Sequence, residues 1–223
     1  MLPKIIIDER IKNVCPELKI GLIKARVDNV ETSAELWAEI EREAAAIVGK
    51  YELLEVNKRP AVAQTRALYR ALGKDPNRYR VASEALCRRV IRGLGLYRID
   101  TLVDLINLVS MKSGYPISGL DADKLVGDTL VMGVGEEGEL YNGIGRGLLN
   151  ISGMPVYRDE KGGVATPTSD EERSKITLDT CTLQMNINGF GEEMPMEEAV
   201  AWSVELLKRY ASATDIETAI VTV

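Results

Sequence analysis

Apolar residues at the start of the chain follow first the period of a strand and then that of a helix. The runs 5–7 and 18–27 predict two strands, and the second is apolar on both faces, which is typical of a buried strand. From residue 32 onward, apolar positions recur every three to four residues and predict a helix. Thr32 and Glu35 have the spacing of a capping box at its start, and Gly49 marks its end.

Helical periodicity continues through the middle of the chain. One helix is predicted from Pro60, because proline fits the first helical position. Two more are predicted to begin at the capping residues Ser83 and Asp100. The segment 75–77, Asp-Pro-Asn, has the composition of a turn between the first two of these helices.

Beyond residue 115 the pattern changes to short β-branched runs separated by glycine-rich turns. The predicted strands cover residues 129–134, 139–142, 155–158, 177–187 and 216–223. A late helix is predicted to begin near Pro195. Helices and strands are segregated rather than alternating, so the pattern predicts an α+β fold. The best internal break lies near residues 57–60, so we expect a strand-strand-helix segment over residues 1–58, packed on a main domain over residues 59–223.

Composition is that of an ordinary soluble domain, with 223 residues, 45% hydrophobic and 28% charged. No apolar run approaches the ~20 residues of a membrane span, and no signal peptide is recognisable, so we expect no membrane contact. Three widely spaced cysteines do not suggest a disulfide framework or a closed zinc site. These features predict free thiols and a cytoplasmic protein.

Histidine is absent, which excludes a histidine base, a histidine metal ligand and a Ser-His-Asp triad. Any general acid or base must therefore be a carboxylate, a tuned lysine, a cysteine or a tyrosine. The net charge of −6 disfavours non-specific binding to nucleic acid, which depends on phosphate neutralisation. We expect no cofactor and no metal, because Asp121 and Asp123 have no further ligand cluster and are better explained as a turn.

Several different short motifs follow one another in a fixed order between Arg59 and Asn188. They are Pro60–Val62, Tyr69-Arg70, Asp75–Arg80, Ser83–Val90, Leu102–Asn107, Gly114–Ile117, Leu120–Leu125 with Gly127, Glu171-Glu172, Ile176-Thr177 and Asp179-Thr180. Each motif is weak by itself. Their order and spacing together resemble the stand-alone B3/B4 proteins, which are single-domain relatives of the B3/B4 domain of the phenylalanyl-tRNA synthetase beta subunit.

This resemblance implies a layered β/β/α sandwich with an editing pocket, which in the synthetase hydrolyses tyrosine wrongly attached to phenylalanine tRNA. Such proofreading exists because one pocket discriminates poorly between near-isosteric side chains. The acidic pocket residue of the synthetase falls on Glu172, which could orient a water or bind an amino group, with Thr168 and Ser169 beside it to hold an oxyanion. The pocket residues implied by the resemblance are Tyr115, Ser118, Asn142, Asp170 and Thr180.

Two features of this chain bear on that implied chemistry. The synthetases carry histidines where this chain has Tyr115 and Ser118, so a step oriented by those histidines cannot be copied here. Glu172 also lies in a run of charged and small polar residues that could simply form a solvated acidic turn.

A basic stretch with interleaved tyrosines is the best candidate for RNA contact in this acidic chain, since arginine matches phosphate geometry and tyrosine can stack on an unpaired base. Its members are Arg66, Arg70, Arg78, Tyr79, Arg80, Arg88 and Arg89. The alternative is that these arginines pair with Asp75, Glu84 and Asp100 on helix surfaces.

Three functions remain open at this stage. The first is a tRNA-related module that binds aminoacyl-tRNA, with hydrolysis of the mischarged ester in trans as its candidate reaction. The second is a non-catalytic module that binds a free amino acid or small metabolite. The third is an interaction protein that kept the fold without a pocket. No ATP-binding signature is present, so we do not expect the chain to charge tRNA by itself, and its oligomeric state is left open.

Overall fold

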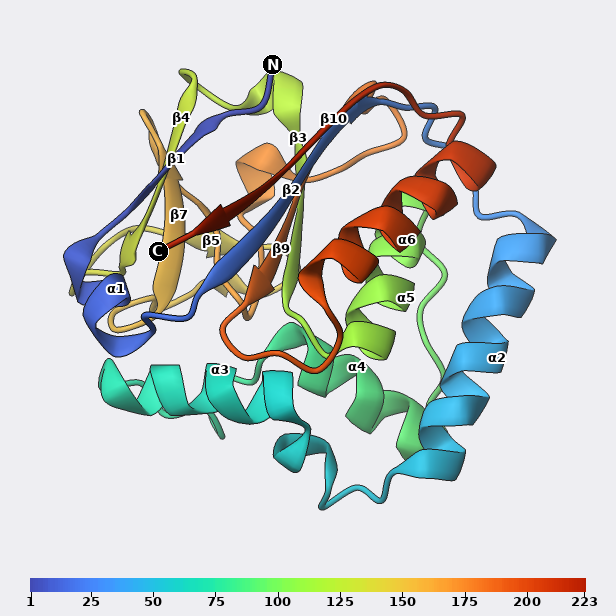
Figure 1. The fold of residues 1–223 in the computed structure, drawn as a ribbon, viewed down its shortest axis with the longest axis horizontal. Helices are drawn as coiled ribbons and strands as arrows, with labels where there is room; N and C mark the ends of the chain where they lie inside the picture. The colour runs from blue at the N-terminus through green and yellow to red at the C-terminus, as the bar shows by residue number, and fades with distance from the viewer.

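The computed structural model describes residues 1–223 and stacks two four-stranded sheets and a layer of helices (Figure 1). The first sheet contains, in spatial order, β1 (Lys4–Ile7), β4 (Thr129–Val134), β7 (Pro155–Asp159) and β8 (Gly162–Ala165). The second contains β10 (Thr214–Thr222), β2 (Lys19–Arg26), β9 (Thr182–Gly189) and β3 (Ile117–Asp121). A two-stranded hairpin consists of β5 (Asn142–Gly143) and β6 (Gly147–Leu148).

The helices cover the outer face of the second sheet and one end of the molecule (Figure 1). They are α1 (Glu9–Val14), α2 (Ala34–Lys50), α3 (Pro60–Ala71), α4 (Ala82–Ile91), α5 (Thr101–Ser113) and α6 (Met196–Tyr210), and single 3₁₀ turns span Val56–Lys58, Ala122–Lys124 and Glu172–Ser174. The architecture is the α+β, layered β/β/α sandwich that was predicted. No helix is both long and apolar enough to cross a membrane.

Residues 1–58 supply one strand to each sheet. β1 pairs in parallel with β4, and β2 lies between β10 and β9 with antiparallel neighbours on both sides. The apolar pattern of β2 on both faces follows from this central position, because one face meets the helices and the other meets the first sheet.

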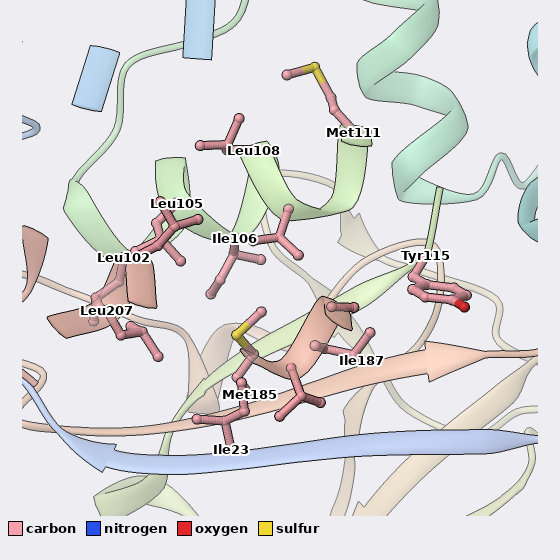
Figure 2. Packing of buried hydrophobic residues seen from close by; sticks show 14 of the residues in the cluster. Ile23, Leu102, Leu105, Ile106, Leu108, Met111, Tyr115, Met185, Ile187 and Leu207 are labelled. Atoms are coloured by element: carbon pink, nitrogen blue, oxygen red, sulfur yellow. The ribbon is translucent and has the colours of Figure 1, made fainter. Parts of the chain in front are cut away.

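Strand β9 separates two hydrophobic cores. Leu183, Met185 and Ile187 point toward the helices and join the larger core, in which α5 and α6 pack on β2 and β9 (Figure 2). A smaller core fills the space between the sheets and includes Leu22 and Met132. The residues of β9 that alternate with the apolar ones are polar, so its face toward the first sheet is not purely hydrophobic.

Two predicted helix starts were wrong by one or two residues. Ser33, not Thr32, caps α2, because the Ser33 hydroxyl accepts the N–H of Leu36 at 3.2 Å. The Thr32 hydroxyl is buried and donates to the carboxylate of Asp104. α4 begins after Val81, and Ser83 lies inside the helix.

Strands β3 and β8 were not predicted from the hydrophobic pattern. For β8, the run 159–163 has the composition of a turn, but Gly162 and Gly163 belong to the strand itself. A Cβ at residue 163 would lie 2.8 Å from the ring of Tyr141, so glycine is required there for close packing rather than for a turn.

A matched pair of glycine substitutions tests the packing of α6 on the second sheet. A Cβ at Gly21 would lie 2.6 Å from Val200 and 2.8 Å from Met196, whereas a Cβ at Gly49 has no neighbour within 4 Å. We expect Gly21→Ala to lower the free energy of unfolding by about 1–3 kcal/mol through overpacking. Gly49→Ala, near the end of α2, should leave it unchanged or raise it by up to ~1 kcal/mol. Urea denaturation measures both, and equal effects would contradict this account of α6 packing.

Candidate functional site

A row of polar side chains lies between the two sheets. Gln184, Asn186 and Asn188 of β9 are each at most 2% exposed. Ser118 of β3 is the register partner of Asn186 and therefore points to the same side of the sheet. From the first sheet, the Tyr157 hydroxyl donates to Oδ1 of Asn188 at 2.7 Å. These contacts make one buried polar cluster where a hydrophobic intersheet core would be expected.

The segment 166–175, called here the closing loop, joins the free edges of the two sheets beside this cluster. Asp170 forms a bridge with Ala165 at the edge strand β8, and Lys175 forms one with Leu120 at the edge strand β3. The β5–β6 hairpin lies against the loop through a bridge between Gly143 and Glu171. The loop therefore closes the intersheet space at the end where the polar side chains gather.

Asp170 is the most perturbed carboxylate of the site. Its Oδ2 accepts the backbone N–H of Gly119 at 3.1 Å, and the Ser118 side chain also interacts with the carboxylate. Burial disfavours the charged form and raises the pKa of Asp170 to about 7, although both of these neighbours act in the opposite direction. The residue as a whole remains half-buried, so its desolvation is partial. A carboxylate whose pKa lies near neutral pH is suited to general acid–base chemistry.

Two buried amide atoms in the cluster have no partner. Nε2 of Gln184 donates to Oδ1 of Asn186 at 2.7 Å, which leaves Oε1 of Gln184 and Nδ2 of Asn186 unpaired. Turning both amides over would exchange their roles and still leave one donor and one acceptor free. Each unpaired buried group costs about 1–3 kcal/mol. Such a donor and acceptor, side by side, fit a ligand that carries both, such as the amino and carbonyl groups of an amino acid.

The three residues predicted to be catalytic make contacts that hold the closing loop in place. Glu172 is half-buried, pairs with Nζ of Lys175 at 2.7 Å and has a pKa lowered chiefly by that lysine. The Thr168 hydroxyl is buried against that of Tyr69 at 2.8 Å. The Ser169 hydroxyl donates to the Asp170 carbonyl at 3.2 Å.

Of the five predicted pocket residues, the structure brings Ser118 and Asp170 together. The hydroxyl of Tyr115 is bonded to the Met194 carbonyl, next to the larger core. Asn142 is exposed on the β5–β6 hairpin. Thr180 donates to the carboxylate of Asp121 at 2.9 Å.

Sequence reasoning missed the amides of β9. The available signal was the alternation of Gln184, Asn186 and Asn188 with Leu183, Met185 and Ile187 in a strand that otherwise has the composition of a buried one. A polar residue at every second position of a fully buried strand indicates a functional face.

A hollow of about 340 Å³ lies beside the closing loop. It is lined by residues of the 138–150 segment, among them Tyr141, Leu148 and Leu149. No residue of the closing loop lines the hollow; its link to the loop is the Tyr141 hydroxyl, which donates to the Ser169 carbonyl at 2.7 Å. A larger cavity of about 690 Å³ lies near Cys15 and Tyr115 and includes no residue of the loop.

Several arginines of the basic stretch make contacts within the protein. The carboxylate of Glu84 is fully buried, and it pairs with Arg66 at 2.9 Å and with Arg88 at 2.8 Å. Nε of Arg80 lies 3.6 Å from the same carboxylate. The Arg89 guanidinium stacks 3.9 Å from the ring centre of Tyr97. For Arg66, Arg80 and Arg88 the alternative of pairing with Glu84 describes the structure, whereas Arg89 has an aromatic partner instead of a carboxylate.

The remaining basic residues lie next to the closing loop. Arg70 and Arg78 are exposed at the end of α3 and in the turn that follows, where Tyr79 stacks under Lys74 at 3.8 Å. This turn is tied to the loop on both sides. Tyr69 contacts Thr168 through their hydroxyls, and the N–H of residue 82 donates to the carbonyl of residue 167 at 2.9 Å.

Asp170 should give stability a distinct pH dependence. Its folded pKa of about 7 lies above the ordinary 3.8, so the native state keeps the proton where the unfolded chain has lost it. The free energy of unfolding therefore falls as the pH rises from about 4 to about 7, by at most ~4 kcal/mol. Asp170→Asn should flatten this slope and be more stable than the wild type above neutral pH. Denaturant unfolding at a series of pH values from about 4 to above 7 measures both effects. Glu172→Gln, as the control, should keep the slope; an unchanged slope in Asp170→Asn would contradict the burial of its charge.

Comparison with known proteins identifies the family. No curated protein matches the chain. Among solved structures, the chain is similar to an N-terminal fragment of the phenylalanyl-tRNA synthetase beta-subunit from Pyrococcus horikoshii, with 10% sequence identity, a TM-score of 0.45, and coverage of 99% of this chain and 52% of that one. The chain thus spans about half the length of that fragment. The model of the B3/4 domain matches residues 64–217, which include β3, the closing loop and β9. The chain belongs to the B3/4 domain family.

Proposed function

We propose that this chain is a tRNA-related module that binds the aminoacyl end of a charged tRNA in the buried polar cluster and hydrolyses the ester. The observation that carries the proposal is the position of the Asp170 carboxylate, which accepts the N–H of Gly119 and interacts with Ser118, the register partner of Asn186. Burial raises the pKa of this carboxylate to about 7, and Gln184 and Asn186 each carry an unpaired amide atom. The resemblance to the synthetase beta subunit supplies the substrate class. Because the proposed substrate is charged tRNA, the proposal places the chain in the cytoplasm.

The proposed reaction uses residues of the cluster in defined roles. Ionised Asp170 takes a proton from a water, whose oxygen attacks the ester carbonyl. Nδ2 of Asn186 is the donor available to the developing oxyanion, and Oε1 of Gln184 is the acceptor available to the substrate amino group. The bond to the ribose oxygen then breaks, and Asp170 returns the proton to that leaving oxygen.

Asp170 suits this role better than Glu172 does. A general base works best when its pKa lies near the operating pH. Glu172 is paired with Lys175 and has a lowered pKa, so its carboxylate is a weaker base than that of Asp170. Its contacts instead connect the closing loop with the hairpin, where it accepts the N–H of Gly145 at 3.3 Å.

The exposed residues beside the loop would hold the RNA. Arg70 and Arg78 can neutralise phosphates, and Tyr79 offers a ring to an unpaired base near the 3′ end. Their position next to the closing loop would bring the charged end of a tRNA to the mouth of the site.

Binding of a free amino acid without turnover is the second candidate. The unpaired donor of Asn186 and the unpaired acceptor of Gln184 favour it, because they match the carbonyl and amino groups of such a ligand without any need for RNA. In this alternative the amides hold the ligand, and Asp170 binds its amino group.

A screen of mischarged aminoacyl-tRNAs for ester hydrolysis tests the catalytic proposal. We expect Asp170→Asn to lower the single-turnover rate at neutral pH by about 100-fold or more, because a positioned base contributes that much. Glu172→Gln should keep most of the activity. Since Asp170→Asn is expected to be the more stable protein at that pH, lost activity cannot be ascribed to unfolding.

Two other outcomes would overturn parts of this proposal. If Glu172→Gln loses the activity and Asp170→Asn keeps it, the base is Glu172 and not Asp170. Stabilisation of the wild type by a free amino acid in a thermal shift assay, without hydrolysis of any charged tRNA, would establish the binding module.

The RNA surface is tested separately by charge removal. The double variant Arg70→Ala with Arg78→Ala should weaken tRNA binding and lower the slope of log affinity against log salt by about two. Arg42→Ala, which removes an exposed arginine from α2, is the matched control and should change neither. Unaltered affinity in the double variant, measured by filter binding, would exclude this surface.

A further inference from the structure

The outer edge of the second sheet is an unprotected strand. β10 has a single neighbour, β2, so half of its backbone N–H and C=O groups point away from the sheet. A bulge, with Asp215 at φ 48°, distorts only its first residues. From residue 218 to residue 222 the register with β2 is continuous, and the sequence Thr-Ala-Ile-Val-Thr carries neither charge nor proline. Natural edge strands usually carry such residues against pairing with another chain.

A groove of about 700 Å³ runs along this edge, between β10 and α6. Its floor includes Ile216 and Ile220, and Ile220 is 37% exposed. On α6 a stripe at helical spacing forms the wall: Glu197, Ala201, Val204 and Lys208. The stripe is small and apolar in the middle and oppositely charged at its two ends.

The charged residues at the ends of the stripe form no ion pair within the chain. The nearby ion pairs join Lys19 with Glu192 and Arg209 with Glu39. Glu197 and Lys208 take part in neither. An acidic end and a basic end on one helix are complementary to the same helix running in the opposite direction.

We propose that this face binds a second copy of the chain, with β10 paired antiparallel to its symmetry mate. A two-fold axis through the uncharged half of β10 would join the two second sheets into one eight-stranded sheet. The same axis makes the two α6 helices antiparallel, so Glu197 of each copy faces Lys208 of the other. The charges at both ends of the groove are therefore complemented by the same two residues of a second copy.

The position of the groove supports the same arrangement. α6 packs on β2, since a Cβ at Gly21 of that strand would touch Val200, and the groove lies between α6 and β10. In a continuous sheet the two grooves would therefore meet above the paired β10 strands. Ala201 and Val204 of each copy would then face the two-fold axis from opposite sides.

Analytical ultracentrifugation over a concentration series tests the proposal. The wild type is expected to form a dimer that dissociates on dilution. Ala201→Glu would place two like charges close to the axis and should raise the dissociation constant at least tenfold. Glu198→Lys, an exposed change on α6 outside the groove, is the matched control and should leave the dimer intact. Circular dichroism melts of each variant at low concentration check that the monomer still folds.

A charge exchange makes the test specific for this geometry. Lys208→Glu alone should weaken the dimer about three- to tenfold, because exposed pairs contribute modestly. Adding Glu197→Lys to it should restore the affinity. The proposal is overturned if the wild type stays monomeric at high micromolar concentration, or if Ala201→Glu leaves the dissociation constant unchanged. It is also overturned if the double variant does not regain the affinity of the wild type. β10 lies at the opposite edge from β3, so these variants leave the intersheet cluster and its proposed function untouched.

Discussion

The structure depends on strand β9 being buried on both faces while carrying apolar side chains on one and amides on the other. The apolar face is part of the larger core, so the strand cannot move away without exposing that core. Its polar face is thereby held out of water, at a cost that only hydrogen bonds or a ligand can offset. The same burial that stabilises the sheet–helix layer thus leaves amide groups without hydrogen-bond partners between the sheets.

The closing loop completes that site because it is held from three directions. Tyr69 and the start of α4 contact its first half, the β5–β6 hairpin lies against it, and its residues Asp170 and Lys175 bridge to β8 and β3. Buried Glu84, with Arg66 and Arg88, connects α3 to α4, so the support is itself rigid. A loop fixed in this way holds the Asp170 carboxylate against β3, where desolvation raises its pKa.

The hydrophobic pattern alone was enough to predict the α+β class and most helices, because helix faces and capping residues are local signals. Short strands such as β3 and β8 were missed, since glycine in them serves close packing, which depends on residues distant in sequence. At the site, sequence reasoning singled out this loop, but it could not tell how the two carboxylates in it differ. Asp170 accepts the N–H of Gly119 on β3, whereas Glu172, two residues on, pairs with Lys175, and these partners depend on how the loop folds.

The absence of histidine explains why burial matters so much in this chain. A free carboxylate titrates near pH 4 and a free lysine near pH 10, so neither can exchange a proton readily at neutral pH without a change of environment. Ser118 lies beside the carboxylate of Asp170. Desolvation raises the pKa of that carboxylate to about 7, the range that an imidazole would otherwise supply. An aspartate in this environment can exchange a proton near neutral pH, because its neighbours in the fold shift the equilibrium that a carboxylate in water would follow.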